Sequence, residues 1–325
     1  MTLPVICVMG PTASGKTALG VALAQALGGE VVSVDSAMVY RGLDIGTAKP
    51  TLAEQGGIRH HLMNLCDPAE SYSAQQFMRD ALVAIEQIRA VGKVPILVGG
   101  TLLYFRSLLA PMASLPQANQ EVRAQLVSAF AEQGAAALHA RLTQLDPEAA
   151  QGIHPNNRQR LIRALEVCVL AGQPMSALWR QAPAQHEPGH VTNDALGVVL
   201  QIGLLPAQRT LLHARIEKRF QAMLAAGFWD EIRTLHARAD LSPECPSLRT
   251  VGYRQLWQYA QGELAWDEAV AAAIAATRQL AKRQLTWLRR WQNLHCFDMM
   301  QDDLTKSVLQ WVDQQRDLAG KAPFN

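Results

Sequence analysis

The stretch GPTASGKT, residues 10–17, matches the phosphate-binding pattern G-x-x-x-x-G-K-[ST]. Its two glycines allow backbone N–H groups to turn inward onto an anion, and a helix that begins near Lys16 adds the favourable field of its N-terminus. Lys16 can neutralise the outer oxygens of a phosphate group, and the Thr17 hydroxyl is a suitable ligand for Mg²⁺. The apolar run Leu3–Met9 precedes the stretch, and helical spacing follows it. This context favours a phosphate loop over a chance match.

The first hundred residues alternate between apolar strands and helices, as a parallel sheet requires. The predicted strands are Leu3–Met9, Glu30–Val34 and Pro95–Val98, and the predicted helices are Lys16–Leu27 and Ser73–Val91. We therefore predict an α/β fold, with a parallel-sheet core like that of P-loop NTPases and helices on both faces. Ligands of such sheets bind at the carboxyl ends of the strands. Residues 10–17, 35–36 and 99–101 all follow strands, so we expect them to line one crevice.

The middle of the chain differs from the first hundred residues in composition and in predicted secondary structure. From about Leu115 it is rich in Ala and Gln and reads as helices, Gln120–Leu145 and Arg158–Leu170, without a strand. Strand character returns at Gly197–Leu205, and helical spacing resumes from Arg209. We predict three segments: residues 1–115 as the first part of the core, 116–195 as a helical insertion, and 196–325 as the second part of the core with basic C-terminal helices. The helix at 157–172 is assigned either to the insertion or to its junction with the core.

Composition excludes several classes of protein. The 325 residues carry a net charge of +2, with 49% apolar and 18% charged residues, so a nucleic-acid surface would have to arise from local clustering. Five scattered cysteines without CxxC spacing favour neither a zinc site nor a disulfide framework, and suggest a reducing cytoplasm. No run of ~18 apolar residues predicts a membrane span, and the N-terminus lacks a signal-peptide pattern. Nothing marks a dimer surface, so we expect a monomer.

The acidic residue expected of a nucleotide hydrolase is absent from the third strand. That strand runs into PILVGGTLLYF, with Thr101 where a metal-ordering Asp would stand. The acid is instead Asp35, at the end of the second strand, which suits a general base or, alternatively, a helix cap or an outer Mg²⁺ ligand. Thr101 could donate a hydrogen bond to a leaving-group oxygen, cap the helix Leu102–Leu109, or do both.

Two basic segments are candidates for binding phosphate groups. Asn157–Arg163 places Arg158, Arg160 and Arg163 within two turns, which suits pyrophosphate or RNA, although a solvated face paired to Glu166 is slightly favoured when the segment is taken alone. The second segment, Arg278–Trp291, contains five basic residues and no acid. We expect one helix face to carry both Trp287 and Trp291, with the rings in the core and the basic face partly functional.

Other polar residues carry weaker signals. His60, His61 and His154 lack the spacing of metal ligands, so packing or surface roles are expected. Lys49, in the turn DIGTAKP, is interpreted either as a phosphate contact or as an exposed side chain.

Together the motifs resemble those of the bacterial tRNA dimethylallyltransferases, also called tRNA isopentenyltransferases. The matching segments are GPTASGKT, VDSAMVYRGLDIGTAKP, LVGGTLLYF, RLIRALEV, LRTVGYRQLW and TRQLAKRQLTWLR, which occur in the family's order across nearly the whole chain. The flanks of GGIRHHLMNLCDP differ a little from the family pattern, away from the catalytic positions.

The resemblance implies a prenyl transfer. The donor would be dimethylallyl pyrophosphate, and the acceptor N6 of the adenine 3′ of the anticodon in tRNA, with Mg²⁺ assisting and pyrophosphate released. Asp35 would take the proton from N6, and Thr101 would hydrogen-bond the oxygen of the breaking C–O bond. The target base would have to be flipped out of the anticodon loop, and the insertion at residues 116–195 would grip the tRNA.

The resemblance also assigns binding residues. The pyrophosphate would lie against Gly10, Pro11, Thr12, Ala13, Ser14, Gly15, Lys16 and Thr17, with Thr17 as the metal ligand. The implied tRNA contacts are Asp35, Ser36, Ala37, Met38, Arg123, Gln159, Arg160, Leu161, Ile162, Arg163, Arg249, Thr250, Val251, Gly252, Tyr253 and Arg254. Further contacts to the tRNA backbone are predicted at Arg278, Lys282, Arg283 and Arg290.

Three other functions share some of these features. An ATP-binding small-molecule kinase would use the same loop but gives the basic C-terminal segment no role. Prenyl transfer to free AMP or ATP would not need the long insertion. An RNA-binding protein with a vestigial loop would not need Lys16, Thr17 and Asp35 together.

Overall fold

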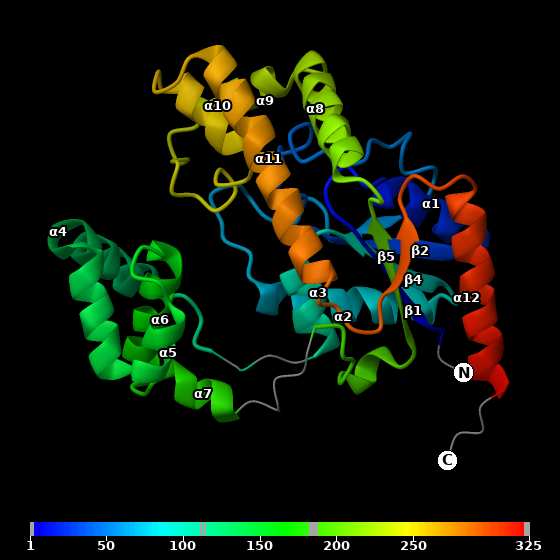
Figure 1. Cartoon of the computed structure of the whole chain (residues 1–325), viewed down its shortest axis with the longest axis horizontal. Coiled ribbons are helices and arrows are strands. Elements are labelled where there is room, and N and C mark those ends of the chain that lie inside the picture. Colours follow the sequence, from blue (N-terminus) through cyan, green and yellow to red (C-terminus); the bar gives the residue numbers. More distant parts are fainter. Residues whose placement is uncertain (1–2, 111–112, 114, 182–187, 322–325) are drawn as a thin grey trace. The chain divides into compact units, whose positions relative to one another are not determined.

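The computed structural model describes residues 3–110, 113, 115–181 and 188–321. It divides the chain into two compact units, which are treated separately here. Unit 1 comprises Met1–Ala110 and Glu187–Asn325, and unit 2 comprises Pro111–His186. The larger unit contains the sheet, and the smaller one is helical (Figure 1).

Unit 1 is built on a six-stranded parallel sheet with the order β3-β2-β4-β1-β5-β6. The strands are β1 Val5–Met9, β2 Gly29–Val34, β3 His60–His61, β4 Val94–Gly99, β5 Val199–Leu205 and β6 His295–Asp298. The three strands predicted from the N-terminal region are confirmed, and β2, β4 and β1 lie side by side. The neighbouring β5 comes from beyond the insertion, so the sheet is completed by the second half of the chain.

Helices cover both faces of this sheet, as predicted. The helices of unit 1 are α1 Lys16–Leu27, α2 Ala74–Ala90, α3 Leu102–Leu109, α8 Arg209–Ala225, α9 Phe228–His236, α10 Tyr253–Ala260, α11 Trp266–Leu288 and α12 Leu304–Lys321, with a short 3₁₀ turn at Asp194–Leu196. Side chains of a strand alternate between the faces. Ile6 and Val8 of β1 therefore pack with α1, α8 and α12, whereas Val5, Cys7 and Met9 pack with α2 and α3.

A second apolar cluster lies among the helices of the C-terminal half. Residues of α8, α9, α10 and α11 pack around Phe228 and Tyr253, whose rings meet edge to face at 4.9 Å between centroids. Tyr40 and Leu43, from the segment that follows β2, are buried in the same cluster. The helices thus fix the position of the loop that leaves the second strand.

The C-terminal basic helix is shorter than the sequence suggested. We expected one helix face to carry Trp287 and Trp291, but α11 ends at Leu288 and Trp291 lies in the turn beyond it. The turn is stabilised because Trp291 Nε1 donates to Gln201 Oε1 at 2.7 Å and Gln292 N donates to the Pro188 carbonyl at 2.7 Å. Both tryptophans nevertheless pack in the core, as predicted.

Unit 2 is a helical bundle with its own core. Its helices are α4 Gln120–Leu145, α5 Pro147–Gly152, α6 Arg158–Ala171 and α7 Met175–Gln181. Helix α4 is broken at Gly134, where φ is 82°. Asp146, buried between α4 and α5, accepts hydrogen bonds from the backbone N–H groups of Ala149 and Ser176 and so joins α5 to α7.

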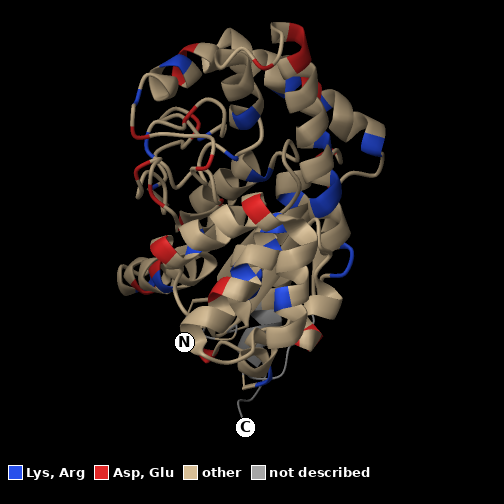
Figure 2. Cartoon of the chain, turned by 90° about the vertical axis from the view of Figure 1, so that its left-hand side faces the viewer, with Lys and Arg blue, Asp and Glu red and all other residues tan. Residues whose placement is uncertain are grey.

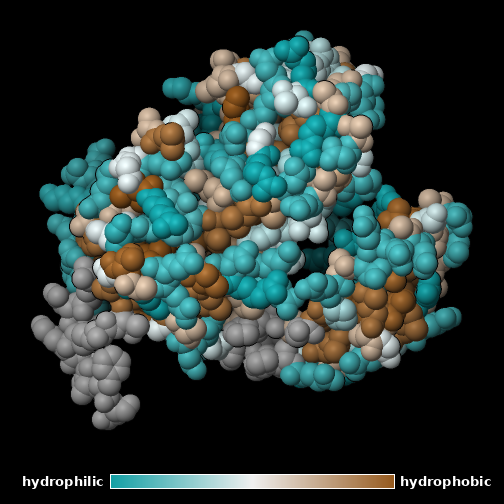
Figure 3. Space-filling view, turned by 180° about the vertical axis from the view of Figure 1, so that it is seen from behind, coloured by the Kyte–Doolittle hydropathy of each residue, from teal (hydrophilic) through white to brown (hydrophobic). Residues whose placement is uncertain are grey.

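The surface carries exposed apolar side chains and interspersed charges. Hydrophobic side chains form separate patches in the view of Figure 3, and both basic and acidic positions occur on the side drawn in Figure 2. In the described part of the chain, no single helix is long and apolar enough to cross a membrane. Only α6 and α7 taken together have the necessary length and apolar composition, and they are bent by 76° relative to each other.

Candidate active site

The loop between β1 and α1 lies at the carboxyl edge of the sheet. Gly15 precedes α1 with φ 86°, a conformation that glycine adopts without steric cost and that other residues rarely adopt. No side chain of the described residues caps α1, so the first backbone N–H groups of the helix are left for another partner. Lys16 Nζ donates to the Pro11 carbonyl at 3.2 Å and thereby folds back over the loop. The Ser14 hydroxyl is buried beneath the loop.

Two arginines from the far half of the chain meet this loop. Arg215 Nε donates to the Ala13 carbonyl at 3.0 Å, and Arg219 Nη1 donates to Thr12 Oγ1 at 3.5 Å. Both lie on α8, four residues apart, so one face of that helix carries both. Sequence reasoning missed them, although the spacing in RIEKRF would place both on one helix face.

Burial, and to a smaller extent the charge of Arg219, lowers the basicity of Lys16. Burial, followed by the charge of Arg219, lowers the pKa of Lys16 to about 8, and the carboxylate of Asp35 offsets part of that shift. Burial also lowers the pKa of Arg219, whose ordinary value is high enough for it to stay protonated. The loop therefore holds concentrated positive charge that an anion would stabilise.

Asp35 leaves one carboxylate oxygen for chemistry. Its Oδ1 accepts hydrogen bonds from the backbone N–H groups of Ala37 at 2.9 Å and Met38 at 3.3 Å, which fixes the turn after β2. The helix cap considered for Asp35 is wrong, because a turn and not a helix follows β2; the carboxylate caps this turn and uses only one oxygen to do so. The side chain also lines the cavity that contains the loop.

Thr101 binds the turn after β2 and does not cap its own helix. Its Oγ1 accepts a hydrogen bond from the Ser36 backbone N–H at 3.1 Å and donates to Ser36 Oγ at 3.4 Å. Thr101 occupies the N-cap position of α3 but makes no side-chain capping bond there. The side-chain cap considered for Thr101 is therefore wrong, because the hydroxyl is directed to the neighbouring strand end.

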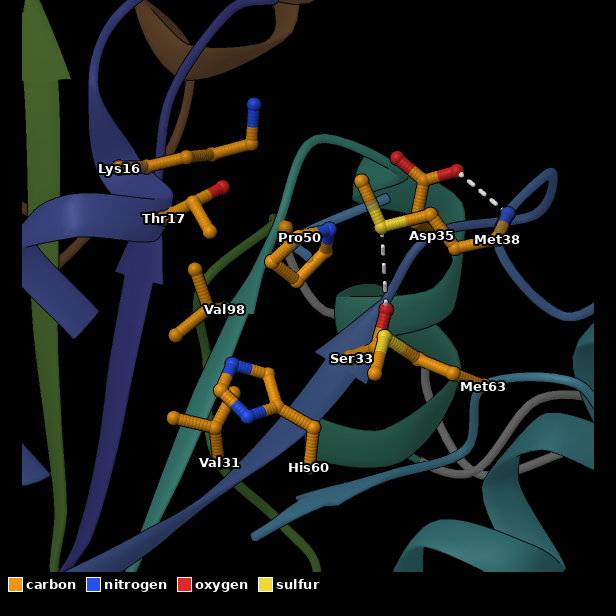
Figure 4. A pocket seen from close by; sticks show the side chains of 11 residues that line it. Lys16, Thr17, Val31, Ser33, Asp35, Met38, Pro50, His60, Met63 and Val98 are labelled. Atoms are coloured by element: carbon orange, nitrogen blue, oxygen red, sulfur yellow. Dashed lines mark hydrogen bonds between the residues drawn. The ribbon is translucent and has the colours of Figure 1, made fainter. Parts of the chain in front are cut away.

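These groups line a cavity at the edge of the sheet that has two parts. The larger part is lined by Lys16, Thr17, Asp35 and Arg219 together with apolar side chains of α8 and α11. The smaller part shares Lys16, Thr17 and Asp35 with it and is otherwise mostly apolar. Figure 4 shows Lys16 and Thr17 on one side of this smaller part and Asp35 on the other, with Pro50, Val98 and His60 between and below them.

Comparisons with known proteins identify the chain. The family model described as IPP transferase matches residues 38–291.

The chain belongs to the IPP transferase family.

Three solved structures are similar to this IPP transferase over most of their length. The tRNA isopentenylpyrophosphate transferase of Bacillus halodurans is 36% identical, with 98% of this chain and 96% of that chain covered and a TM-score of 0.67. The tRNA delta(2)-isopentenylpyrophosphate transferase of Staphylococcus epidermidis is 32% identical, with 96% and 99% covered and a TM-score of 0.66. A eukaryotic dimethylallyltransferase described as acting on tRNA is 26% identical, with 100% and 81% covered and a TM-score of 0.77. The family resemblance inferred from the motifs is confirmed.

Several residues that the resemblance assigned to tRNA lie at the cavity of this IPP transferase. Ala37, Met38, Thr250 and Val251 line it. Arg249 and Arg254 are exposed, and Arg249 is paired with Glu244. Gly252 and Tyr253 are buried, so the Tyr253 ring serves the core of the C-terminal helices.

One carboxylate that sequence reasoning missed shapes the cavity wall. Glu231, on α9, accepts hydrogen bonds from the backbone N–H groups of Asp44 at 2.9 Å, Ile45 at 2.7 Å and Gly46 at 3.2 Å, and from the Tyr253 hydroxyl. Burial and the Glu231 charge raise the pKa of Tyr253 well above its usual value, so the phenol remains a donor. Gly46 is itself part of the wall.

Lys49 has neither of its predicted roles. Its side chain is only 6% exposed, and Nζ donates to the Tyr40 carbonyl at 2.8 Å, to Asn64 Oδ1 at 2.6 Å and to Asp44 Oδ1 at 2.5 Å. All three lysine protons are therefore used to hold the segment between β2 and β3, and both the phosphate contact and the exposed side chain are wrong.

His60 and His61 are fixed by contacts within the protein, and His60 also lines the smaller part of the cavity. His61 Nε2 lies 2.7 Å from Glu30 Oε2 in a buried pair, and His60 Nδ1 donates to the Ile58 carbonyl at 2.9 Å. Over the described ranges, no cluster of three or more His, Cys, Asp or Glu residues could hold a metal ion.

In unit 2, two of the assigned arginines share a buried carboxylate. Glu166 is fully buried and accepts from Arg123 Nη2 at 2.7 Å and Arg163 Nη1 at 2.8 Å. Arg163 also donates to the Pro116 carbonyl at 2.6 Å. The pairing considered for Glu166 is confirmed, but both arginines keep exposed surface. Of the remaining assigned residues in this segment, Gln159 and Arg160 are exposed, while Leu161 and Ile162 are in the core.

The basic residues of the C-terminal segment differ in their surroundings. Arg278, on α11, is paired with Glu217 of α8 at 2.8 Å. Lys282, Arg283 and Arg290 are exposed, and no ion pair to any of them occurs among the residues that the structure describes. These three have their charge available for another molecule.

Proposed function

We propose that this chain transfers the dimethylallyl group of dimethylallyl pyrophosphate to N6 of the adenine 3′ of the anticodon in tRNA and releases pyrophosphate. The observation that carries the proposal is the cavity in which the Asp35 carboxylate faces Lys16 and Thr17, in a chain of the IPP transferase family. The related eukaryotic enzyme is described as a dimethylallyltransferase acting on tRNA, which supports the choice of acceptor.

The loop at residues 10–17 would bind the leaving group. The N-terminal N–H groups of α1, Lys16 and Arg219 would stabilise the negative charge that grows on pyrophosphate as the C–O bond breaks. Thr101, at the adjacent strand end, would hydrogen-bond the bridging oxygen of that bond by turning its single hydroxyl proton away from Ser36 Oγ, 3.4 Å distant, towards the substrate. The mostly apolar part of the cavity suits the five-carbon chain, since Val98 and Pro50 offer it a surface without polar competition.

Asp35 would act as the general base. The N6 lone pair of adenine is delocalised into the ring, so the amine is a weak nucleophile and gains from removal of its proton as the new C–N bond forms. One Asp35 oxygen is held by the turn, and the other is available to accept that proton. The base and the leaving-group cradle stand on opposite sides of the space where the carbon would be transferred (Figure 4).

Mg²⁺ fits this site as a partner of the substrate. The described residues form no metal cluster of their own, but Mg²⁺ in phosphate sites is commonly held by one or two protein oxygens together with phosphate oxygens. Thr17 Oγ1 would supply one such oxygen, with the Asp35 carboxylate nearby in the same cavity. When bound, the ion would neutralise charge on the pyrophosphate group.

The direct test is mass spectrometry of tRNA nucleosides after incubation with dimethylallyl pyrophosphate and Mg²⁺. Expected is N6-dimethylallyladenosine in tRNA, with AMP and ATP unmodified in parallel reactions. Modification of AMP or ATP instead would favour the free-nucleotide alternative, and ATP consumption with unmodified tRNA would favour a kinase. We also propose a monomer that works in the cytoplasm, and light scattering of the purified protein tests the first part.

The pKa of Lys16 predicts a pH dependence of donor binding. Because this pKa is about 8 without a ligand, the lysine loses its charge as the pH rises above that value, and binding of pyrophosphate must then take up a proton. The KM for dimethylallyl pyrophosphate should therefore rise above pH 8, by up to ~10-fold per pH unit. In Lys16→Arg the guanidinium stays protonated, so its KM should be flat over the same range. A wild-type KM as flat as that of the arginine variant would contradict the prediction.

The exposed basic residues predict the salt dependence of tRNA binding. For Arg283→Ala and Arg290→Ala, we expect weaker tRNA binding and a slope of log K against log salt that is reduced by ~0.7–0.9 for each lost phosphate contact. Lys306→Ala on α12 removes the same charge elsewhere and should leave the slope unchanged. If the salt slopes of Arg283→Ala and Arg290→Ala equalled those of Lys306→Ala and the wild type, these arginines would make no phosphate contact and would serve only as solvated surface.

A further inference from the structure

Gln284 joins two parts of the cavity that no sequence motif connects. It lies on α11 and is half-buried, and its side-chain amide makes two hydrogen bonds to backbone groups. Its Oε1 accepts from the Thr12 N–H at 2.9 Å, and its Nε2 donates to the Gly100 carbonyl at 2.9 Å. Thr12 belongs to the loop after β1, and Gly100 to the turn after β4.

These bonds continue a strand pairing beyond its end. The pairing between strands β1 and β4 ends at Met9 and Gly99. Gln284 bonds to Thr12, three residues after Met9, and to Gly100, the residue after Gly99, and so holds the two segments at a fixed separation. The first of these segments is the loop that contains Lys16, and the second is the turn that contains Thr101.

The bridge needs the chemistry of an amide. One end must accept from an N–H group while the other donates to a carbonyl, and among neutral side chains of this length only glutamine offers both. Gly100 completes the fit, because a Cβ at that position would lie 2.5 Å from Gln284 Nε2. A residue with a side chain at 100 would displace the amide.

We propose that Gln284 is a positioning residue for prenyl transfer. By fixing the loop against the Thr101 turn, it holds the pyrophosphate cradle and the hydroxyl that meets the bridging oxygen in one geometry. The inference rests on the proposed function. Because the Thr12 N–H is used by Gln284, the N–H groups nearer α1 are the ones left for the pyrophosphate. The residue also links the cradle to α11, the helix that carries Lys282 and Arg283 on its exposed surface.

The first test compares Gln284→Met with Gln279→Met. Methionine keeps the length and helix propensity of glutamine but cannot make either hydrogen bond, and Gln279 is an exposed glutamine of the same helix. Displacements of about 1 Å in an active site can cost ~100-fold in rate, so kcat of the Gln284 variant should fall by at least ~10-fold. Its KM for tRNA should stay within ~2-fold, because the surface of α11 is unchanged. The Gln279 variant should match the wild type in both constants.

The second test uses Gln284→Glu across pH. An ionised carboxylate would repel the Gly100 carbonyl, whereas a protonated carboxyl group can donate to it and still accept from Thr12. The ratio of kcat between this variant and the wild type should therefore rise as the pH is lowered, and taking the ratio cancels the titration of other groups.

Each outcome is decisive when rates are measured well below the unfolding midpoint of every variant. A kcat for Gln284→Met within ~2-fold of the wild type would overturn the positioning role, as would a loss explained entirely by its unfolded fraction or a pH-independent ratio for Gln284→Glu. Failure of the wild type itself to prenylate tRNA would instead overturn the proposed function, and the role of Gln284 with it.

Discussion

Asp35→Asn is expected to lower kcat by ~10²-fold or more while tRNA affinity stays close to that of the wild type. Asparagine retains an Oδ1 that can accept from the backbone N–H groups of Ala37 and Met38, so the turn after β2 keeps its hydrogen bonds. It cannot take the N6 proton. Single-turnover prenylation measures the loss, and filter binding of tRNA shows that the acceptor is still bound. Asp302→Asn, an exposed change in the same residue type, serves as the control.

The same variant separates the two roles that the sequence left open for Asp35. If the carboxylate acts mainly through Mg²⁺, raising the Mg²⁺ concentration should restore much of the rate. If it is the general base, the rate stays low at saturating Mg²⁺, which is the result we expect. A turnover close to normal at ordinary Mg²⁺ concentrations would remove Asp35 from both roles.

Lys16→Met should produce the second large effect. Removing a preorganised charge from the site of a leaving group commonly costs ~10²–10³-fold, so kcat/KM for dimethylallyl pyrophosphate should fall by that amount. Methionine fills a similar volume and leaves Arg219 as the remaining cation at Thr12. Titration calorimetry with pyrophosphate, the released product, should show correspondingly weaker binding, while tRNA binding is kept.

Lys306→Met provides the matched loss of a lysine charge and should leave both measurements unchanged. Equal pyrophosphate affinities for Lys16→Met and the wild type would mean that the loop at residues 10–17 does not hold the leaving group. The donor would then have to bind in another part of the cavity.

The parts of the site that could be predicted are those that local sequence determines. A parallel sheet brings the carboxyl ends of its strands to one edge, so Asp35, Thr101 and the loop that contains Lys16 were expected together before any coordinates. The structure confirms the fold class, and the comparisons confirm the family.

The parts that could not be predicted come from contacts between residues far apart in the chain. Arg219 meets Thr12 across 207 positions, and Gln284 meets it across 272. Local spacing can place such a residue on a helix face but cannot say which loop that face will contact. The predictions for Lys49 were wrong for a related reason, because its three ammonium protons are donated to three oxygens of the folded segment around it. The helical position predicted for Trp291 was wrong because a bond to Gln201 favours the turn over three more helical residues.

The way in which unit 2 joins the rest of the chain has a consequence for how such enzymes can change. Where the chain returns to unit 1, the backbone N–H groups of Thr192 and Asn193 both donate to the Leu109 carbonyl, at 2.9 and 3.1 Å, and the Asn193 side chain donates to the Leu108 carbonyl at 2.8 Å. The exit and the re-entry are thus fastened at one point of the scaffold. A segment attached in this way can be lengthened, exchanged or excised during evolution without shifting a strand of the sheet or the cavity at its edge.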